Sequence, residues 1–401
     1  MSRIRMPVIQ KLFIKRFRSY PAAEVTFGNP LFIVGRNGSG KSNFADIFAF
    51  VADAMKSPLQ AVFDSRGGIG AVRNRSTGSG YSPNLGLTLE LGPMNGEAKR
   101  GRYSLEIKAL PNYGFEIIRE TAEVELNDGT LSSFDRSSRH GFKTKAEGIN
   151  PALEPAALCL PVVGGDARFA PLLRTLSGMR VYSIEPARLR DMQDPDSGMG
   201  LKRDGSNAAS VLQELSRTDR QAFERVQEFL AAIVPDTLSV RPKKHSNKLT
   251  MEFTQEWAPG KRLQFESSTM SDGTLRALGL LMAVFQKPTP TVMVIEEPEA
   301  TIHPGALPAI LDMIRQAAVS MQVIVTTHSP ELLDAKWIAD EHLRVGVWER
   351  GASAILPVDA AARSAIRDHI MGAGELLRAG ALLPEESSAA GKEASKRSSD
   401  K

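Results

Sequence analysis

The residues with the clearest chemical meaning form a glycine-rich stretch near the N-terminus, Gly35-Arg36-Asn37-Gly38-Ser39-Gly40-Lys41-Ser42. This stretch matches G-x-x-x-x-G-K-[ST] in full, and it lies between an apolar run and a segment with helical spacing. Glycines allow main-chain N–H groups to wrap phosphates, and the following helix points its positive end at them. We therefore predict a phosphate-binding loop, in which the Lys41 amine contacts the β- and γ-phosphates and the Ser42 hydroxyl binds Mg²⁺. The residues predicted to hold the nucleotide here are Gly35, Asn37, Gly38, Ser39, Gly40, Lys41, Ser42 and Asn43.

Two adjacent acids follow a second apolar run. Residues 291–299 read TVMVIEEPE, so a buried strand would deliver Glu296 and Glu297 to its carboxyl end. Ligands of open α/β sheets bind at that edge. One carboxylate there can hold Mg²⁺ through water, and the next can orient or activate an attacking water. Glu296 is therefore the candidate metal-binding acid and Glu297 the candidate catalytic acid, and a solvated acidic turn is the alternative.

Two further positions could contact phosphate. Ser271 precedes a predicted helix and is a good N-cap, but the same helix start, with Ser271 and the bare backbone of Gly273, could also bind phosphate. His328 follows a predicted strand over 322–326 and could contact a γ-phosphate. A second phosphate-binding helix start indicates a nucleotide held between two subunits. For His303 we expect a structural or interfacial role.

The surrounding pattern predicts the elements that position these residues. From residue 271 onward helix and strand alternate, which predicts a parallel sheet with crossover helices. Upstream, short strands separated by turn residues predict antiparallel hairpins, and residues 132–165 are predicted to form a long loop. The other predicted strands lie at 9–17, 22–27, 31–34, 85–91, 102–109, 114–126, 180–184, 237–241, 248–254 and 261–266, and the predicted helices at 43–55, 207–215, 219–232 and 305–319.

Composition narrows the class of protein. The chain has 401 residues, with 50 Lys and Arg against 46 Asp and Glu and a net charge of +4, which excludes a histone-like or strongly acidic protein. Cys159 is the one cysteine, so an intrachain disulfide and a multi-cysteine metal cluster are excluded. Apolar runs stay below the ~18–20 residues of a membrane span. We expect a cytoplasmic protein that makes no membrane contact.

Two clusters of basic residues contain no acid. They span residues 136–145 and 241–248, and they are either contacts for DNA phosphates or solvated loops.

Taken together, these motifs resemble the ABC-type ATPase superfamily, in the branch of predicted AAA ATPases that includes SMC, RecF and OLD-like proteins. The order is the same: Walker A at 35–42, signature at 271–274, Walker B at 292–297, D-loop near 300–304 and switch histidine at 328. The resemblance implies an α/β fold, a P-loop NTPase head of ABC type with an antiparallel β subdomain and an inserted helical lid. The expected segments are 1–135 and 266–383 for the two parts of the head, 136–265 for the insert and 384–401 for a disordered tail.

The resemblance also implies a mechanism with ATP and Mg²⁺ as cofactors. Two heads form a homodimer that sandwiches two ATP molecules, with Glu297 as catalytic glutamate, Glu296 as the acid associated with Mg²⁺ and His328 as γ-phosphate sensor. The implied function is an ATP-gated switch in DNA maintenance or in defence against phage and other foreign DNA. Candidate partners are DNA and a separate effector protein such as a nuclease. The alternatives are the nucleotide-binding subunit of a transporter and a non-hydrolysing, ATP-dependent scaffold that regulates a nuclease.

The chain departs from the family pattern at several places. Glu296 stands where the family has Asp, which predicts slow turnover, and the signature reads Ser-Asp-Gly-Thr. No glutamine can be assigned to the Q-loop, for which Gln60 is the candidate. Sustained heptads are absent and little chain follows His328, so we expect neither a long coiled coil nor a Toprim nuclease domain. The segments 182–186 and 204–207 resemble stretches in the same branch, without an assigned chemical role.

Overall fold

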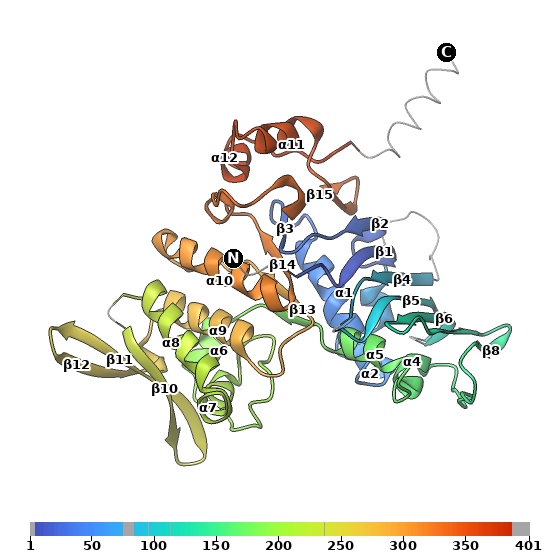
Figure 1. Ribbon diagram of the computed structural model, residues 1–401, viewed down its shortest axis with the longest axis horizontal. Coiled ribbons are helices and arrows are strands. Elements are labelled where there is room, and N and C mark those ends of the chain that lie inside the picture. The colour runs from blue at the N-terminus through green and yellow to red at the C-terminus, as the bar shows by residue number, and fades with distance from the viewer. Residues whose placement is uncertain (1–4, 75–83, 95, 113, 236, 387–401) are drawn as a thin grey trace.

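The computed structural model describes residues 5–74, 84–94, 96–112, 114–235 and 237–386. The chain forms two sheets that meet around helix α1, together with a separate lobe built from the middle of the chain (Figure 1).

A six-stranded sheet forms the centre of the head, with the order β16-β15-β3-β14-β13-β9. Its strands are β3 (Leu31–Val34), β9 (Arg180–Tyr182), β13 (Val292–Glu296), β14 (Gln322–Thr327), β15 (Leu343–Glu349) and β16 (Ala352–Leu356). All neighbouring pairs are parallel except β15 with β16. This confirms the predicted parallel sheet with crossover helices.

Both faces of this sheet are covered, which explains why its strands are apolar throughout. Along β3, Leu31 and Ile33 face the core that contains α1 (Lys41–Ala54), whereas Phe32 and Val34 face the core that contains α9 (Asp272–Phe285) and α10 (Leu307–Ser320). Successive side chains of a strand point to opposite faces, so one short apolar run supplies both cores.

A seven-stranded antiparallel sheet, with the order β2-β1-β4-β5-β6-β7-β8, packs on the α1 side. Its strands are β1 (Ile9–Phe17), β2 (Tyr20–Thr26), β4 (Asn84–Leu91), β5 (Ala98–Ala109), β6 (Phe115–Leu126), β7 (Leu131–Ser137) and β8 (Gly141–Thr144). The same region contains the short helices α2 (Leu59–Asp64), α3 (Ile69–Val72), α4 (Cys159–Val163) and α5 (Ala170–Ser177).

The prediction of a long loop over residues 132–165 is wrong, because β7, β8 and α4 lie within it. The inward-facing positions of β7 are Ser132, Phe134 and Arg136, all of them buried. Since two of these three buried residues are polar, the sequence of this strand lacks the alternation of apolar and polar residues that predicts a strand.

The middle of the chain forms a lobe over residues 186–266, which is shorter than the expected insert of 136–265, and from here on the insert means this lobe. It contains α6 (Pro186–Arg190), α7 (Ala208–Thr218) and α8 (Arg220–Ile233), followed by a three-stranded antiparallel sheet. The strands of that sheet are β10 (Thr237–His245), β11 (Lys248–Ala258) and β12 (Lys261–Glu266), which confirms the three strands predicted here. The insert packs on α9 through α6, α7 and α8 (Figure 1).

Two expected segment boundaries can be placed against these elements. The boundary between residues 135 and 136 falls inside β7, so we propose that the first part of the head extends to the end of β9. The second part adds α11 (Ala360–Arg367) and α12 (Ala373–Arg378) after β16. Of the expected tail, Pro384 pairs with Val358, and residues 387–401 lie outside the described residues.

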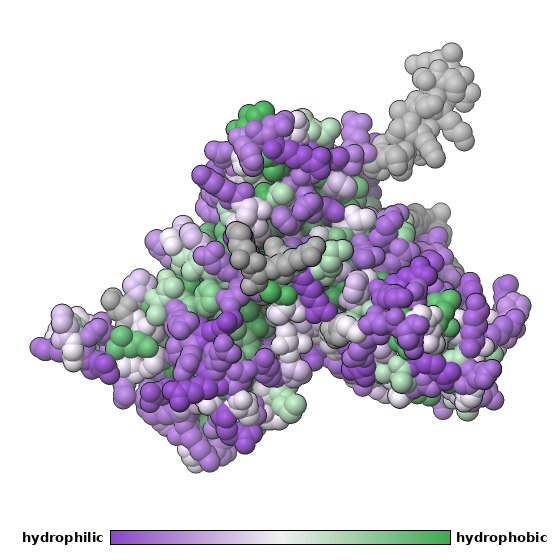
Figure 2. All heavy atoms as spheres, in the orientation of Figure 1, coloured by the Kyte–Doolittle hydropathy of each residue, from purple (hydrophilic) through white to green (hydrophobic). Residues whose placement is uncertain are grey.

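The surface seen in Figure 2 is predominantly hydrophilic over the insert and over the seven-stranded sheet. Within the described residues, every helix falls short of the length and apolarity needed to cross a bilayer.

Candidate nucleotide-binding site

The glycine-rich loop connects β3 directly to α1. Gly40 has φ +99°, and a Cβ there would lie 2.2 Å from the Ser353 hydroxyl on β16, so only glycine fits. Gly38 also has a positive φ, +81°, but nothing lies within 4 Å of where its Cβ would be. Because no side chain caps the first turn of α1, the loop has an open side and uncapped N–H groups beside it. This cradle fits a phosphate group.

Lys41 turns its amine back into the loop. Its Nζ donates to the carbonyls of Gly35 at 2.7 Å and Arg36 at 3.1 Å, and lies 3.8 Å from Glu297 Oε1. Burial lowers the pKa of Lys41, and the nearby carboxylates of Glu297 and Glu299 act against that shift. The amine is therefore a poorly solvated cation at the mouth of the loop, and a phosphate would supply the negative charge that the two carbonyls lack.

The other predicted loop residues divide into two groups. Asn37 and Ser42 are exposed, so both are free to meet a ligand. Asn43 instead donates to the Ser19 hydroxyl at 2.9 Å, on the turn between β1 and β2, and in this structure it holds α1 to that turn. Ser39 is buried, and its hydroxyl has no hydrogen-bond partner.

The two acids lie where the apolar strand ends, as predicted. Glu296 is the last residue of β13 and is 7% exposed, whereas the Glu297 side chain is 34% exposed. Glu297 has φ +45° and its N–H donates to the Thr326 carbonyl at 2.9 Å. The chain therefore turns sharply between the two acids and keeps Glu297 beside β14.

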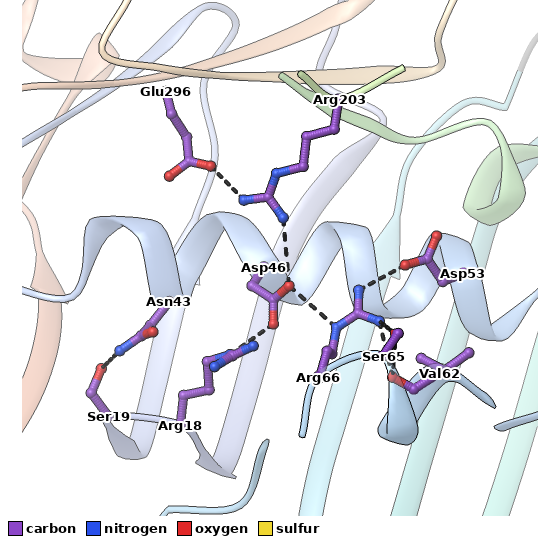
Figure 3. A network of polar contacts seen from close by, with 10 residues as sticks. All are labelled: Arg18, Ser19, Asn43, Asp46, Asp53, Val62, Ser65, Arg66, Arg203 and Glu296. Carbon is purple, nitrogen blue, oxygen red and sulfur yellow. Dashed lines mark hydrogen bonds and ion pairs between the residues drawn. The ribbon is translucent and has the colours of Figure 1, made fainter. Parts of the chain in front are cut away.

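Glu296 has an ion-pair partner that the sequence did not indicate. Oε1 of Glu296 lies 2.7 Å from Arg203 Nη2, and the other nitrogen of that guanidinium lies 3.9 Å from Asp46 on α1. Figure 3 shows Arg203 between the two carboxylates, with Arg18 and Arg66 also reaching Asp46.

Arg276 on α9 is a second residue missed from the sequence. Its guanidinium donates to the main-chain carbonyls of Ile184 at 3.0 Å, Glu296 at 3.2 Å and Glu297 at 2.8 Å. Burial lowers the pKa of Arg276, and the three nearby glutamates act against that shift. The helix that begins at the signature serine thus holds the backbone of both candidate acids.

His328 lies at the carboxyl end of β14, next to the acids. Its Nδ1 is 3.3 Å from Glu297 Oε1, and its main-chain N–H donates to Glu299 Oε1, also at 3.3 Å. Glu299 accepts a second hydrogen bond from the Thr327 hydroxyl at 2.6 Å, and its other oxygen is buried without a partner. Glu299 therefore fixes the turn that presents His328. The feature of the sequence that could have identified Glu299 is its position as a third acid, two residues after Glu297.

The signature residues start a different helix. Ser271 caps α9 by accepting from the Thr274 N–H at 3.3 Å, and the Asp272 side chain pairs with Arg190 of the insert. A Cβ on Gly273 would lie 2.6 Å from the Thr301 carbonyl, so the helix start passes close to the 300–304 turn. Among the described residues, no hydrogen bond or ion pair joins residues 271–274 to the loop at 35–42.

The predicted metal ligands suit a hard cation. Ser42 offers a hydroxyl and Glu296 a carboxylate, whereas no group of three or more His, Cys, Asp or Glu able to hold a metal occurs in the described part of the chain. Mg²⁺ is commonly bound by one or two protein oxygens together with substrate phosphates and waters. The residues present therefore fit Mg²⁺ that arrives with a nucleotide.

Other candidates lie away from this edge. Gln60 donates to Asp64 within α2. The strand beside β13 is β9, which ends at Tyr182 and is followed by Ser183-Ile184-Glu185, without a glutamine. His303 accepts from the Gly305 N–H at 3.1 Å and caps a short turn, in line with the structural alternative.

Several side chains of the two basic clusters are buried or paired in the structure. Arg136 is buried and donates to the main-chain carbonyls of Glu154, Pro155 and Ala157. In the other cluster, Lys243 pairs with Glu252 at 2.6 Å and Glu266 at 3.0 Å, and Lys248 pairs with Asp194. The first cluster therefore has one cation buried against main-chain carbonyls, and acids from a neighbouring strand and loop neutralise part of the second cluster.

Comparison with solved structures relates this head to SMC proteins. The chain is similar to the structure described as "Crystal structure of the SmcHead bound to the C-winged helix domain of ScpA", with 16% identity, a TM-score of 0.55 and coverage of 89% of this chain and 99% of that one. It is also similar to an SMC head with an extended coiled coil bound to the C-terminal domain of ScpA from Pyrococcus furiosus. That match has 15% identity, a TM-score of 0.53 and coverage of 91% and 100%. These matches show a shared fold.

Comparison with curated proteins found no match. A protein-family model, however, matches residues 31–155 and 184–334, more than half of the chain. The matched ranges include the phosphate loop, the signature, both acids and His328. The chain belongs to the family described as "AAA domain, putative AbiEii toxin, Type IV TA system", and its AAA domain has the fold of SMC heads.

Proposed function

We propose that the chain is an ATP-hydrolysing switch that closes as a homodimer around two nucleotides and opens after hydrolysis. The observation that carries this proposal is that two side chains meet one oxygen of Glu297. Lys41 Nζ lies 3.8 Å and His328 Nδ1 3.3 Å from Glu297 Oε1. The helix start at Ser271 and Gly273 contacts the insert and the 300–304 turn instead. A second copy would supply its own Ser271 and Gly273 to the phosphates, through the same surface on both subunits.

Each residue then has a role that its position supports. Lys41 leaves the carbonyls of its own loop for the phosphates, Glu297 accepts a proton from the attacking water and His328 donates to the γ-phosphate. Ser42 and Glu296 would hold Mg²⁺, which would neutralise charge on the phosphate oxygens. ATP favours the closed dimer because its γ-phosphate contacts both subunits, and hydrolysis removes that difference in affinity.

We further propose that this switch acts in DNA maintenance or in defence against foreign DNA, through a separate effector such as a nuclease. The two similar SMC heads were each solved with a domain of ScpA, a separate protein, which supports a separate partner here. Arg139, Lys143 and Lys145, all exposed at or beside the edge strand β8 of the seven-stranded sheet, are the remaining candidates for DNA contact in the first basic cluster.

One observation favours the second candidate, a scaffold that binds ATP without hydrolysing it. Glu296 replaces the shorter Asp of the family and is already neutralised by Arg203 at 2.7 Å. Release of phosphate from ATP by the full chain separates the two candidates, because the scaffold would form the dimer without any turnover.

Dimer formation tests the first proposal. Light scattering of Glu297→Gln with ATP and Mg²⁺ should show a dimer, and the same protein without ATP should be monomeric. Adding Ser271→Ala should prevent that dimer while leaving the affinity of each chain for nucleotide unchanged.

The matched control for this experiment is Asp359→Ala. Asp359 caps α11 by accepting from the Ala362 N–H at 2.8 Å, so its loss also costs about 1 kcal/mol of helix capping. The Asp359→Ala protein should still dimerise. A dimer that survives Ser271→Ala would remove the signature from the interface, and failure of the chain to bind ATP would remove the proposal altogether.

A further inference from the structure

Two sequence segments without an assigned role lie side by side in the structure. The strand β9 leads into Ser183-Ile184-Glu185, and the loop that we call the Arg203 loop, residues 201–207, runs along it. The N–H of Ser183 donates to the Arg203 carbonyl and the N–H of Glu185 to the Asp204 carbonyl, both at 3.0 Å. This pairing fixes the backbone of Arg203 at the sheet edge where β13 also ends.

The side chain of Arg203 lies between two carboxylates. It is 2.7 Å from Glu296 and 3.9 Å from Asp46. Figure 3 shows the guanidinium between the two acids. Glu296 is 7% exposed, so its negative charge needs a partner at all times. Asp46 already has Arg18 at 2.7 Å and Arg66 at 3.3 Å. Arg203 thus has a close contact with the metal-binding acid and a second carboxylate within reach.

The other end of the Arg203 loop is tied to the sheet of the insert through Gln193, which is 4% exposed. The amide of Gln193 donates to the Gly205 carbonyl at 3.3 Å and accepts from the Ala209 N–H at 2.8 Å. Its main chain exchanges two hydrogen bonds with Leu249 on β11, at 2.8 and 2.9 Å. One residue therefore joins the loop, the start of α7 and the β10–β12 sheet.

The loop is also packed against the insert rather than free to move alone. Gly205 has φ +84°, and a Cβ there would lie 2.5 Å from Leu189 on α6. Asn207 accepts from the Lys202 N–H at 2.8 Å and donates to the Gly200 carbonyl at 3.0 Å. A displacement of Arg203 would therefore be shared with α6 and β11.

We propose that Arg203 is a positioning residue that couples a divalent cation at Glu296 to the conformation of the insert. A cation that arrives with the nucleotide takes over the neutralisation of Glu296 and repels the guanidinium beside it. Arg203 then moves toward Asp46, and Gln193 transmits the movement to β11. This inference rests on the proposed binding of ATP with Mg²⁺.

Amide hydrogen exchange of the full chain tests this coupling. All proteins carry Glu297→Gln to prevent turnover, and each is compared with ATP plus EDTA against ATP plus Mg²⁺. In the protein with Arg203 intact, exchange in residues 193–207 and 248–254 should change at least about twofold on addition of Mg²⁺. Arg203→Gln should lose this response yet keep its affinity for ATP in EDTA, and Arg203→Lys, which keeps the charge, should restore part of it.

Arg18→Gln is the matched control, because it removes an arginine from Asp46 without touching Glu296. This variant should keep the response to Mg²⁺. An unchanged response in Arg203→Gln, or no response with Arg203 intact although Mg²⁺ and ATP bind, would overturn the coupling and leave the proposed function standing. A chain that binds no ATP would overturn both.

Discussion

Two carboxylates in this molecule each lie beside an arginine, and they are held in different ways. Glu120 on β6 is 0% exposed and accepts from the N–H groups of Cys159 at 2.5 Å and Leu160 at 2.9 Å, and from the Tyr103 hydroxyl at 3.1 Å. Arg136 is more distant, at 3.8 Å. Burial raises the pKa of Glu120, and these N–H groups, the hydroxyl and the guanidinium act against that shift.

Glu296 has the opposite arrangement. Among the described residues, its side chain pairs with a single flexible guanidinium, that of Arg203, which is itself half exposed. Main-chain N–H groups move only when the backbone moves, whereas a surface guanidinium can rotate away when another cation arrives. We therefore interpret Glu120 as a fixed structural centre that joins α4 to the antiparallel sheet, and Glu296 as an exchangeable centre at the ligand edge.

We expect substitutions at the two centres to affect different properties of the protein. Substitutions at the exchangeable edge should change ligand binding or turnover with little change in stability. Substitutions at the fixed centre should change stability with little change in ligand binding.

The largest effect is expected for Glu297→Gln. Loss of a positioned general base lowers the rate by about 10²- to 10⁴-fold, so phosphate release should fall by that factor while ATP is retained. The thermal midpoint should stay within a few degrees of the unmodified chain. The control is Glu331→Gln, at an acid that follows His328 in the chain and accepts from the Ser329 hydroxyl, and this variant should turn over normally. Normal turnover in Glu297→Gln would remove Glu297 from the catalytic role.

Lys41→Ala is expected to have the next largest effect. Hydrogen bonds to charged groups contribute about 1.5–3 kcal/mol, so the affinity for ATP should fall by roughly 10- to 100-fold or more. Fluorescent nucleotide binding measures this directly. Lys56→Ala, which removes a lysine beyond the end of α1, is the control and should bind as before. Unchanged affinity in Lys41→Ala would show that the 35–42 loop does not bind the nucleotide.

These two predictions concern residues that the sequence alone identifies. Lys41 and Ser42 are recognisable because their spacing in a glycine loop is local, and Glu296, Glu297 and His328 because they end apolar strands. Parallel strands bring their carboxyl ends to one edge, so local patterns are sufficient to predict that these side chains meet.

The residues that the sequence did not indicate act across longer separations. Arg203 pairs with an acid 93 positions away, and it lies in a polar loop without periodicity. Arg276 sits on a helix whose apolar spacing predicts only packing, although its guanidinium holds the carbonyls of both acids. β7 was missed for a related reason, because Arg136 points inward to satisfy main-chain carbonyls. The hydrophobic pattern of a sequence does not identify polar side chains that form hydrogen bonds with buried backbone groups.

At the fixed centre, Glu120→Gln should destabilise the fold. The amide keeps the shape of the carboxylate but replaces one acceptor oxygen with a donor, which then faces an N–H of Cys159 or Leu160. An unsatisfied buried donor costs about 1–3 kcal/mol of the free energy of unfolding. Urea denaturation measures this loss, and the affinity for ATP of the folded protein should be unchanged. Equal stability of the two proteins would mean that Glu120 is not the fixed centre of this region.

The smallest effect is expected for Tyr103→Phe, which removes one of the three donors to Glu120 and leaves the ring packed. Burial raises the pKa of Tyr103 far above its usual value, so the hydroxyl is a donor at any working pH. Its net contribution should be about 0.5–1.5 kcal/mol, below that of Glu120→Gln. The double variant then decides whether the two groups act together. This variant carries both Glu120→Gln and Tyr103→Phe. If the hydroxyl stabilises only through Glu120, the double variant should lose measurably less free energy of unfolding than the sum of the two single losses. Strict additivity would instead mean that the Tyr103 hydroxyl contributes independently of Glu120, and Glu120 would then be held mainly by the N–H groups of α4.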